Sequence, residues 1–308
     1  MLAIFLKTLP FFGLIGLGWL AARSRFFPAE GAAWLTRFVF FFALSAMLFR
    51  LAAGLDLAAL FDPRFVVAYL AGSTLIWAVG LWVARARGLP AVEAAMEAQC
   101  CISGNTGFLG VPMLVVLFGP AAAGPVLMVL TIDMLVYSTL ITLIVHAARS
   151  GGLRLGTAVP VLRGIVANPM ILSMAAGLIW SQMRLPMPGP LEEFLTILGA
   201  AATPGALFAI GASLAGLRLG RLAASAWLSL VKLALHPLAV ALACWLMAVE
   251  PFAAGVMIAA AALPVAGNIY ILAQYFGVAQ QRVSAAILIS TAIGIVTIPI
   301  VMLLIGQG

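Results

Sequence analysis

Apolar runs of about 20 residues recur along the whole chain and are joined by short connections. A run of this length crosses the hydrocarbon core of a bilayer as one α-helix. Because lipid offers no hydrogen-bond partners, a spanning backbone must pair its own polar groups, as a helix does. We therefore expect an all-α polytopic membrane protein with ten transmembrane helices. The expected spans lie near residues 3–22, 34–53, 65–84, 94–118, 125–147, 163–181, 192–216, 222–248, 252–277 and 282–305.

The composition excludes a soluble domain. Of the 308 residues, 65% are hydrophobic and 8% are charged, whereas soluble domains have about 45–50% apolar and about 25% charged residues. The net charge of +7 does not indicate nucleic-acid binding, because the 16 basic residues form no stripe with interleaved aromatics. The three cysteines have no metal-ligand spacing with a histidine, so we expect neither a metal nor another cofactor.

The distribution of basic residues predicts the orientation in the membrane. Lysine and arginine are enriched in cytoplasmic loops. If the N-terminus is outside, eleven of the 16 basic residues fall in inner loops and four in outer segments. Both termini are therefore expected outside, and the first apolar run is expected to be a retained helix rather than a signal peptide. Glu93 and Glu97 flank the inner start of the fourth span, where we expect them to be solvated.

Two of the expected spans are interrupted in their middle. The fourth contains "GNTGFLGVP" (104–112) and the ninth contains "LPVAGNIY" (263–270). Proline removes a backbone donor and glycine adds backbone freedom, so both motifs predict a broken helix. The motifs lie five spans apart, and an odd number of crossings reverses the direction of entry. We therefore expect two inverted five-helix repeats, residues 1–150 and 151–308, a common plan of secondary transporters.

The interruptions predict a ligand site at the middle of the membrane. A broken helix in lipid survives only where protein or a water-filled cavity covers its free backbone groups. Half-helix N-termini then suit an anion, and free carbonyls suit a cation. Asn105 and Asn268 add amides that both donate and accept hydrogen bonds. A packing kink is the alternative for either break alone, but two matched breaks, each with an asparagine, favour a site.

Three stretches carry a family resemblance. "GNTGFLGVP", "TPGALFAIGASL" (203–214) and "LPVAGNIYILAQYFG" (263–277) resemble the auxin efflux carrier family, which includes plant PIN auxin exporters and bacterial permeases for malate or malonate. The resemblance extends over the whole chain. It implies the fold of bile-acid/sodium symporters, with a scaffold of spans 1, 2, 6 and 7 that can form a homodimer. Spans 3–5 and 8–10 would be a transport domain in which spans 4 and 9 cross.

The resemblance also implies an elevator-type alternating-access motion in the bacterial inner membrane, with the site at the helix crossover. By motif match, Asn105, Pro112, Pro264 and Asn268 would line it. Ser45 stands where the second span of the family usually carries a proline. The candidate substrate-binding residues are Ser45, Asn105, Thr106, Gly107, Pro112, Pro264, Gly267, Asn268 and Ile269. The third span lacks the charges of plant members, and the loop between spans 5 and 6 is short, which argues against auxin as the substrate.

Ionisable groups inside the membrane are costly and are functional candidates by default. Asp133 lies in the fifth span and shares a helix face with Tyr137. It could carry a proton or help to hold a cation, or it could be a structural carboxylate. Lys232, which shares a face with His236 in the eighth span, could attract an anion, pair with Asp133 or snorkel to an interface. Gln274 follows the break of the ninth span and completes the candidates for ion or proton coupling.

These patterns predict a secondary transporter that moves a small organic anion, such as a mono- or dicarboxylate. A Walker-type motif is absent, so direct use of ATP is not expected. An enzyme is not expected, because the sequence has no HExxH, GxSxG or paired intramembrane aspartates. A channel would usually place its pore on the symmetry axis of several subunits. The anion, the direction of transport and the choice among proton coupling, sodium symport and uniport stay open.

Overall fold

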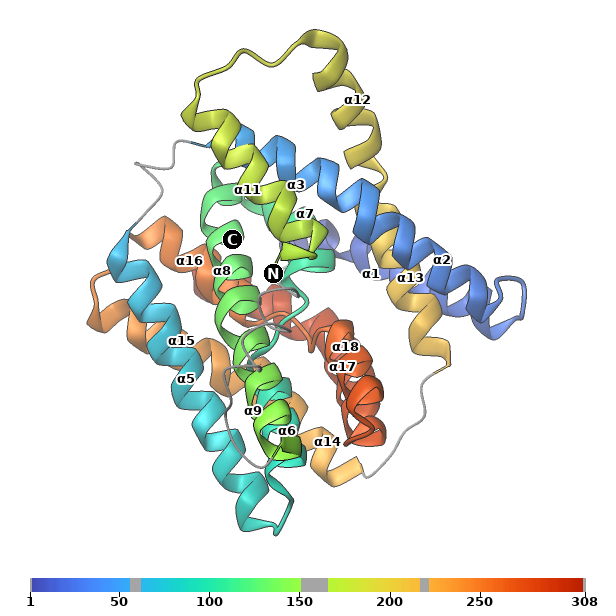
Figure 1. Ribbon diagram of the computed structural model, residues 1–308, viewed down its shortest axis with the longest axis vertical. Coiled ribbons are helices and arrows are strands. Elements are labelled where there is room, and N and C mark those ends of the chain that lie inside the picture. Colours follow the sequence, from blue (N-terminus) through green and yellow to red (C-terminus); the bar gives the residue numbers. More distant parts are fainter. Residues whose placement is uncertain (1, 56–61, 151–165, 217–221, 307–308) are drawn as a thin grey trace.

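The computed structural model describes residues 2–55, 62–150, 166–216 and 222–306 (Figure 1). These residues are almost entirely helical, with one isolated β-bridge among them. The α-helices are α1 (Leu2–Arg23), α2 (Ala29–Phe38), α3 (Leu44–Ala53), α5 (Pro63–Ala86), α6 (Ala91–Ile102), α7 (Val111–Phe118), α8 (Ala123–Ile132), α9 (Ser138–Ser150), α11 (Pro169–Gln182), α12 (Gly189–Ala200), α13 (Ala202–Ala215), α14 (Leu222–Leu230), α15 (His236–Leu246), α16 (Pro251–Ala261), α17 (Gly267–Phe276) and α18 (Gln280–Leu304). Four π-helical turns and one 3₁₀ turn join some of them: η1 (Val39–Ala43), η2 (Thr106–Gly110), η3 (Pro120–Ala122), η4 (Asp133–Tyr137) and η6 (Val231–Leu235).

Seven continuous helical stretches of the described chain are long and apolar enough to cross a membrane. They are Phe5–Arg23, Ala29–Ala53, Pro63–Ala86, Pro120–Val145, Gly189–Ala215, Leu222–Leu246 and Gln280–Leu304. The expected fourth and ninth spans are not among them because each is divided into two shorter helices. The first three residues of the expected sixth span, 163–165, lie outside the described residues. The expected second repeat begins at residue 151, which also lies outside them. The count of ten spans therefore stays a prediction.

Several helices begin at a proline that follows a capping residue. Proline suits the first helical position because its missing N–H has no intrahelical acceptor there. Asp62 accepts a hydrogen bond from the backbone N–H of Arg64 at the start of α5. Asn168 accepts from Met170 and Ile171 at the start of α11. The dipeptides Asp-Pro and Asn-Pro thus fix where these two helices enter the apolar region.

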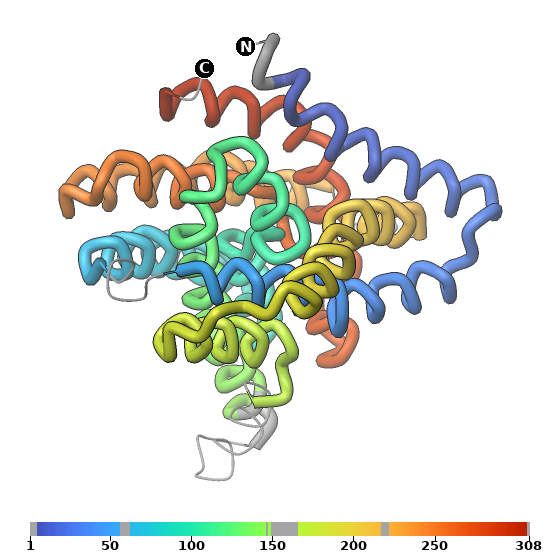
Figure 2. The backbone as a smooth tube through the Cα atoms, turned by 90° about the horizontal axis from the view of Figure 1, so that it is seen from above, coloured from blue at the N-terminus to red at the C-terminus, as the bar shows by residue number. Residues whose placement is uncertain are grey.

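The helices pack in two groups. In the first group α1 and α2 pack on α13, while α3 packs on α11 and α12. In the second, α5 packs on α6 and α15, and α18 packs on α14 and α17. Figure 2 shows α1 and α2 (blue) with α13 (gold) on one side, and α5 (cyan) with α15 and α16 (orange) on the other. In addition, η2 and α7 contact α13, so the interrupted fourth span meets both groups.

Glycines allow α1 and α13 to approach closely. A Cβ atom added at Gly18 would lie 2.1 Å from the carbonyl oxygen of Phe208, and one added at Gly211 would lie 1.9 Å from that of Ile15. Small residues at such contacts let helix backbones touch, which is the main way helices associate in lipid. The "IGAS" and "GLG" segments therefore hold the first group together.

We expect Gly211→Ala to destabilise the protein by about 1–3 kcal/mol, because its methyl group meets backbone and not a movable side chain. Thermal unfolding of detergent-purified protein measures the effect. Gly13→Ala is the matched control, since a Cβ there meets no atom within 4 Å. Equal melting temperatures for the two variants would contradict the role of this contact.

Candidate functional site

The two interrupted spans meet at their breaks. Helix α6 stops at Ile102 and the chain resumes at Thr106, while α16 stops at Ala261 and α17 begins at Gly267. The linkers run antiparallel: Asn105 donates its backbone N–H to the Pro264 carbonyl at 2.9 Å, and Ala266 donates to the Ser103 carbonyl at 3.0 Å. Each break thus satisfies backbone groups that the other leaves free, which apolar surroundings require.

Neighbouring side chains complete this pairing. Ser290 of α18 accepts a hydrogen bond from the backbone N–H of Val265 at 3.0 Å, and the Gln99 side-chain amide donates to the Ser103 hydroxyl at 2.9 Å. At Gly104 an added Cβ would lie 3.2 Å from the Ala260 carbonyl oxygen. A side chain there would be tightly placed because the two backbones lie close together. The breaks are therefore held in place from several helices.

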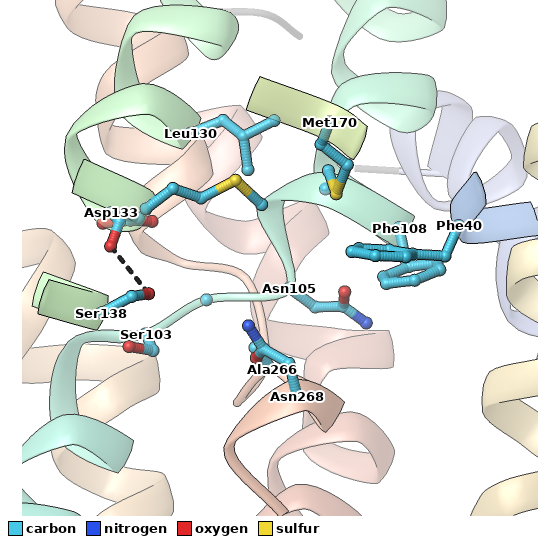
Figure 3. Close-up of a pocket in the computed structure, with 13 residues that line it drawn as sticks. Phe40, Ser103, Asn105, Phe108, Leu130, Asp133, Ser138, Met170, Ala266 and Asn268 are labelled. Carbon is cyan, nitrogen blue, oxygen red and sulfur yellow. Dashed lines mark hydrogen bonds between the residues drawn. The ribbon is translucent and has the colours of Figure 1, made fainter. Parts of the chain in front are cut away.

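A small cavity of about 60 Å³ opens beside the paired linkers (Figure 3). Of the predicted substrate-binding residues, Asn105, Gly107 and Asn268 line it, and so does the coupling candidate Asp133. Polar atoms also come from Ser103 and Ser138. Other walls are apolar and are formed by Phe40, Phe108, Leu130, Met134, Met170 and Ala266. The cavity therefore combines a polar floor with an apolar cover.

Two half-helix N-termini border this cavity. The turn η2 begins after Asn105, and α17 begins after Ala266, which is extended and makes no side-chain cap. The Asn105 carbonyl accepts from Leu109 and Gly110, but the first N–H groups of a helix have no intrahelical acceptor. Such N–H groups and the helix dipole favour an anion. Asn105 is buried and Asn268 is exposed, and Asn268 lies below the linker that carries Asn105 (Figure 3).

Asp133 is held by hydrogen bonds from two helices. The Tyr69 hydroxyl of α5 donates to one carboxylate oxygen at 2.8 Å, and the Thr106 hydroxyl lies 3.5 Å from the other. Tyr137, one turn further along, donates to the Leu70 carbonyl at 3.1 Å and does not line the cavity. Asp133 therefore links the cavity to α5 and to the break of the fourth span.

Lys232 is fully buried behind the crossing point. Its ammonium group donates to the Ala261 carbonyl, the last of α16, and lies 3.2 Å from His236 Nδ1. The other ring nitrogen of His236 hydrogen-bonds to Ser73 of α5 at 2.9 Å. The structure excludes snorkelling of Lys232 to an interface, because its side-chain nitrogen contacts the C-terminal carbonyl of α16 in the interior of the protein. It does not line the cavity.

The other predicted site residues do not line the cavity. The Ser45 hydroxyl donates to the Phe40 carbonyl at 3.1 Å, and Pro264 contributes the carbonyl that pairs with Asn105. Gln274 is exposed on α17. The other predicted substrate-binding residues that do not line the cavity are Thr106, Pro112, Gly267 and Ile269. Their binding roles stay predictions.

Sequence reasoning missed the apolar cover and the π-turns that position it. Phe40 lies on η1 and Phe108 on η2, and their rings stack with centroids 6.2 Å apart. Asp133 and Lys232 also lie on π-turns, η4 and η6. Such turns are rare and often occur at functional sites. The stretch "FVFFFA" (38–43) is rich in phenylalanine, but the sequence does not indicate which of these rings lines the cavity. Among the described residues no group of His, Cys, Asp and Glu could hold a metal ion.

The sequence profile of the family described as "Membrane transport protein" matches residues 3–155 and 155–302. The chain belongs to this membrane transport family. This confirms the resemblance to the auxin efflux carriers and makes the protein a membrane transporter, not an enzyme. A "Putative malonate transporter" from Rhizobium meliloti (strain 1021) is 34% identical over 98% of this chain and 95% of its own. An "Uncharacterized transporter" from Methanothermobacter thermautotrophicus (strain ATCC 29096 / DSM 1053 / JCM 10044 / NBRC 100330 / Delta H) is 25% identical over 93% of both chains.

Proposed function

We propose that this protein is a secondary transporter of a small carboxylate, bound where the two interrupted spans meet. The observation that carries the proposal is the cavity between two half-helix N-termini, lined by the amides of Asn105 and Asn268. Backbone N–H groups and side-chain amides suit a carboxylate, because an ionised acceptor strengthens each hydrogen bond. The name of the Rhizobium relative supports a small dicarboxylate such as malonate.

The two helix groups are proposed to move relative to each other. The first group, with α1 to α3 and α11 to α13, would be the scaffold through which two copies form a homodimer. The second group, with α5 to α9 and α14 to α18, would be the transport domain of an elevator. The inverted repeat is supported by the order of elements: a long helix, a broken helix and a long helix occur in α5 to α9 and again in α14 to α18.

The proposed topology has both termini outside the bacterial inner membrane. The start of α1 and the end of α18 lie near each other in both views (Figures 1 and 2). An even number of crossings returns the chain to its starting side, so this proximity supports an even number of spans, as the ten-span arrangement requires. The excess of basic residues in the alternate loops supports the orientation.

Coupling is proposed to act through Asp133. Its carboxylate lies at the cavity and is held by Tyr69, so a proton or a cation bound there would change the charge that the substrate meets. Lys232 would place its amino group behind the breaks, on the carbonyl end of α16. Tyr137 would orient α5 against η4. Gln274, exposed on α17, would act only outside the cavity.

Uptake into proteoliposomes tests the function. We expect saturable uptake of radiolabelled malonate or succinate that excess unlabelled acid inhibits, and a weaker response to indole-acetate. A sodium gradient and a pH step, imposed separately, distinguish sodium symport from proton coupling, and indifference to both indicates uniport. Empty liposomes provide the background. Absence of uptake and of competition by every carboxylate would contradict the proposal, and currents of channel size would replace it with a pore.

A further inference from the structure

The cavity cover contains one side chain that fits against a glycine. Met170 lies in the first turn of α11 and is 1% exposed. Its terminal methyl carbon lies 2.8 Å from the position that a Cβ at Gly107 would occupy, and Leu130 approaches the same position at 3.6 Å. The absence of a side chain at residue 107 therefore makes the room that Met170 fills at the start of the η2 half-helix.

Met170 and the asparagines lie on different sides of this cavity. Figure 3 shows Met170 and Leu130 above the linker, with Asn268 and Ala266 below it and the Phe40–Phe108 stack at the side. With one carboxylate on the amides, the apolar cover bounds the space that is left for the rest of the molecule. The cavity is small, about 60 Å³, and Met170 and Leu130 are among the side chains that bound it. The cover therefore limits the size of the acid.

We propose that Met170, seated against Gly107, sets the size limit of the substrate, so that the site takes short unbranched carboxylates and rejects those with a ring. This rests on the proposed function. Methionine suits such a position because it is unbranched and fills irregular space. Met170 belongs to the first helix group and Gly107 to the interrupted span, so the limit lies at the surface where the two groups meet.

Shortening this side chain tests the proposal. The experiment measures how strongly unlabelled acids inhibit the uptake of labelled malonate and, separately, of labelled succinate into proteoliposomes. The unlabelled acids are malonate, succinate, phenylmalonate and indole-acetate. We expect Met170→Ala to lower the half-inhibitory concentration of phenylmalonate about tenfold relative to that of malonate. Met174→Ala is the matched control, because Met174 lies one turn further along α11, is buried, and does not line the cavity. Its selectivity should equal that of the wild type.

A second pair of variants keeps the test decisive. Gly107→Ala should push the Met170 methyl group into the cavity and weaken uptake, and Met170→Ala in that background should restore it. Met170→Val replaces Met170→Ala if the latter does not elute as a single folded species. Unchanged selectivity in a folded, active Met170 variant would overturn the size limit alone. Absence of carboxylate uptake by the wild type would overturn the proposed function as well.

Discussion

Replacing Asn105 or Asn268 with alanine is expected to weaken carboxylate binding about 10- to 100-fold in each case, and the double variant should transport nothing measurable. Each amide lines the cavity beside a half-helix N-terminus. A hydrogen bond to a charged group contributes about 1.5–3 kcal/mol, and about 1.4 kcal/mol corresponds to a tenfold change in affinity. Concentration dependence of labelled malonate and succinate uptake measures the loss.

Two further variants show whether charge is recognised there. Asn268→Asp keeps the shape of the side chain and adds a negative charge, so it should weaken anion binding more than Asn268→Ala does. Gln281→Ala removes an amide from the exposed start of α18 and should leave uptake unchanged. The assignment fails if both asparagine variants keep the wild-type affinity while remaining folded.

Arg282→Ala is expected to destabilise the protein by about 3 kcal/mol, the largest stability effect we predict. Arg282 of α18 lies 2.6 Å from Glu97 and 2.5 Å from Glu93, both on α6, and Arg87 also pairs with Glu97. The Arg282–Glu97 approach is an ionic contact and not a directed hydrogen bond. The Glu97 side chain is 2% exposed, and removing one partner of a buried pair costs about 3–5 kcal/mol. Arg87 compensates for part of this loss.

Thermal unfolding in detergent measures the effect of Arg282→Ala. Arg64→Ala removes an exposed arginine and should change the melting temperature little. Adding Glu97→Gln to Arg282→Ala should recover part of the loss, because a neutral amide is cheaper to bury than an unpaired carboxylate. If Arg282→Ala melts like Arg64→Ala, the cluster does not stabilise the fold.

The expected solvation of Glu93 and Glu97 shows one limit of the sequence. Glu93 lies in the first turn of α6, where the helix dipole favours a carboxylate, but Glu97 lies one turn further along and is buried. For Glu97 the expectation was wrong, because Arg282, far along the chain, covers it. A local pattern predicts which residues start a helix, but burial of a charge depends on the partner that tertiary packing brings to it.

The all-helical membrane class, the family and both helix interruptions follow from the amino-acid sequence alone. Lipid makes these features local: apolar length gives a span, and proline with glycine ends it. The surroundings of the breaks, in contrast, depend on how the helices pack in three dimensions, and the fold supplies them. It paired Asn105 with Pro264, placed Lys232 on the end of α16, and closed the cavity with Phe40 and Met170. These contacts join residues from distant segments, and close packing of side chains, not periodicity, selects them.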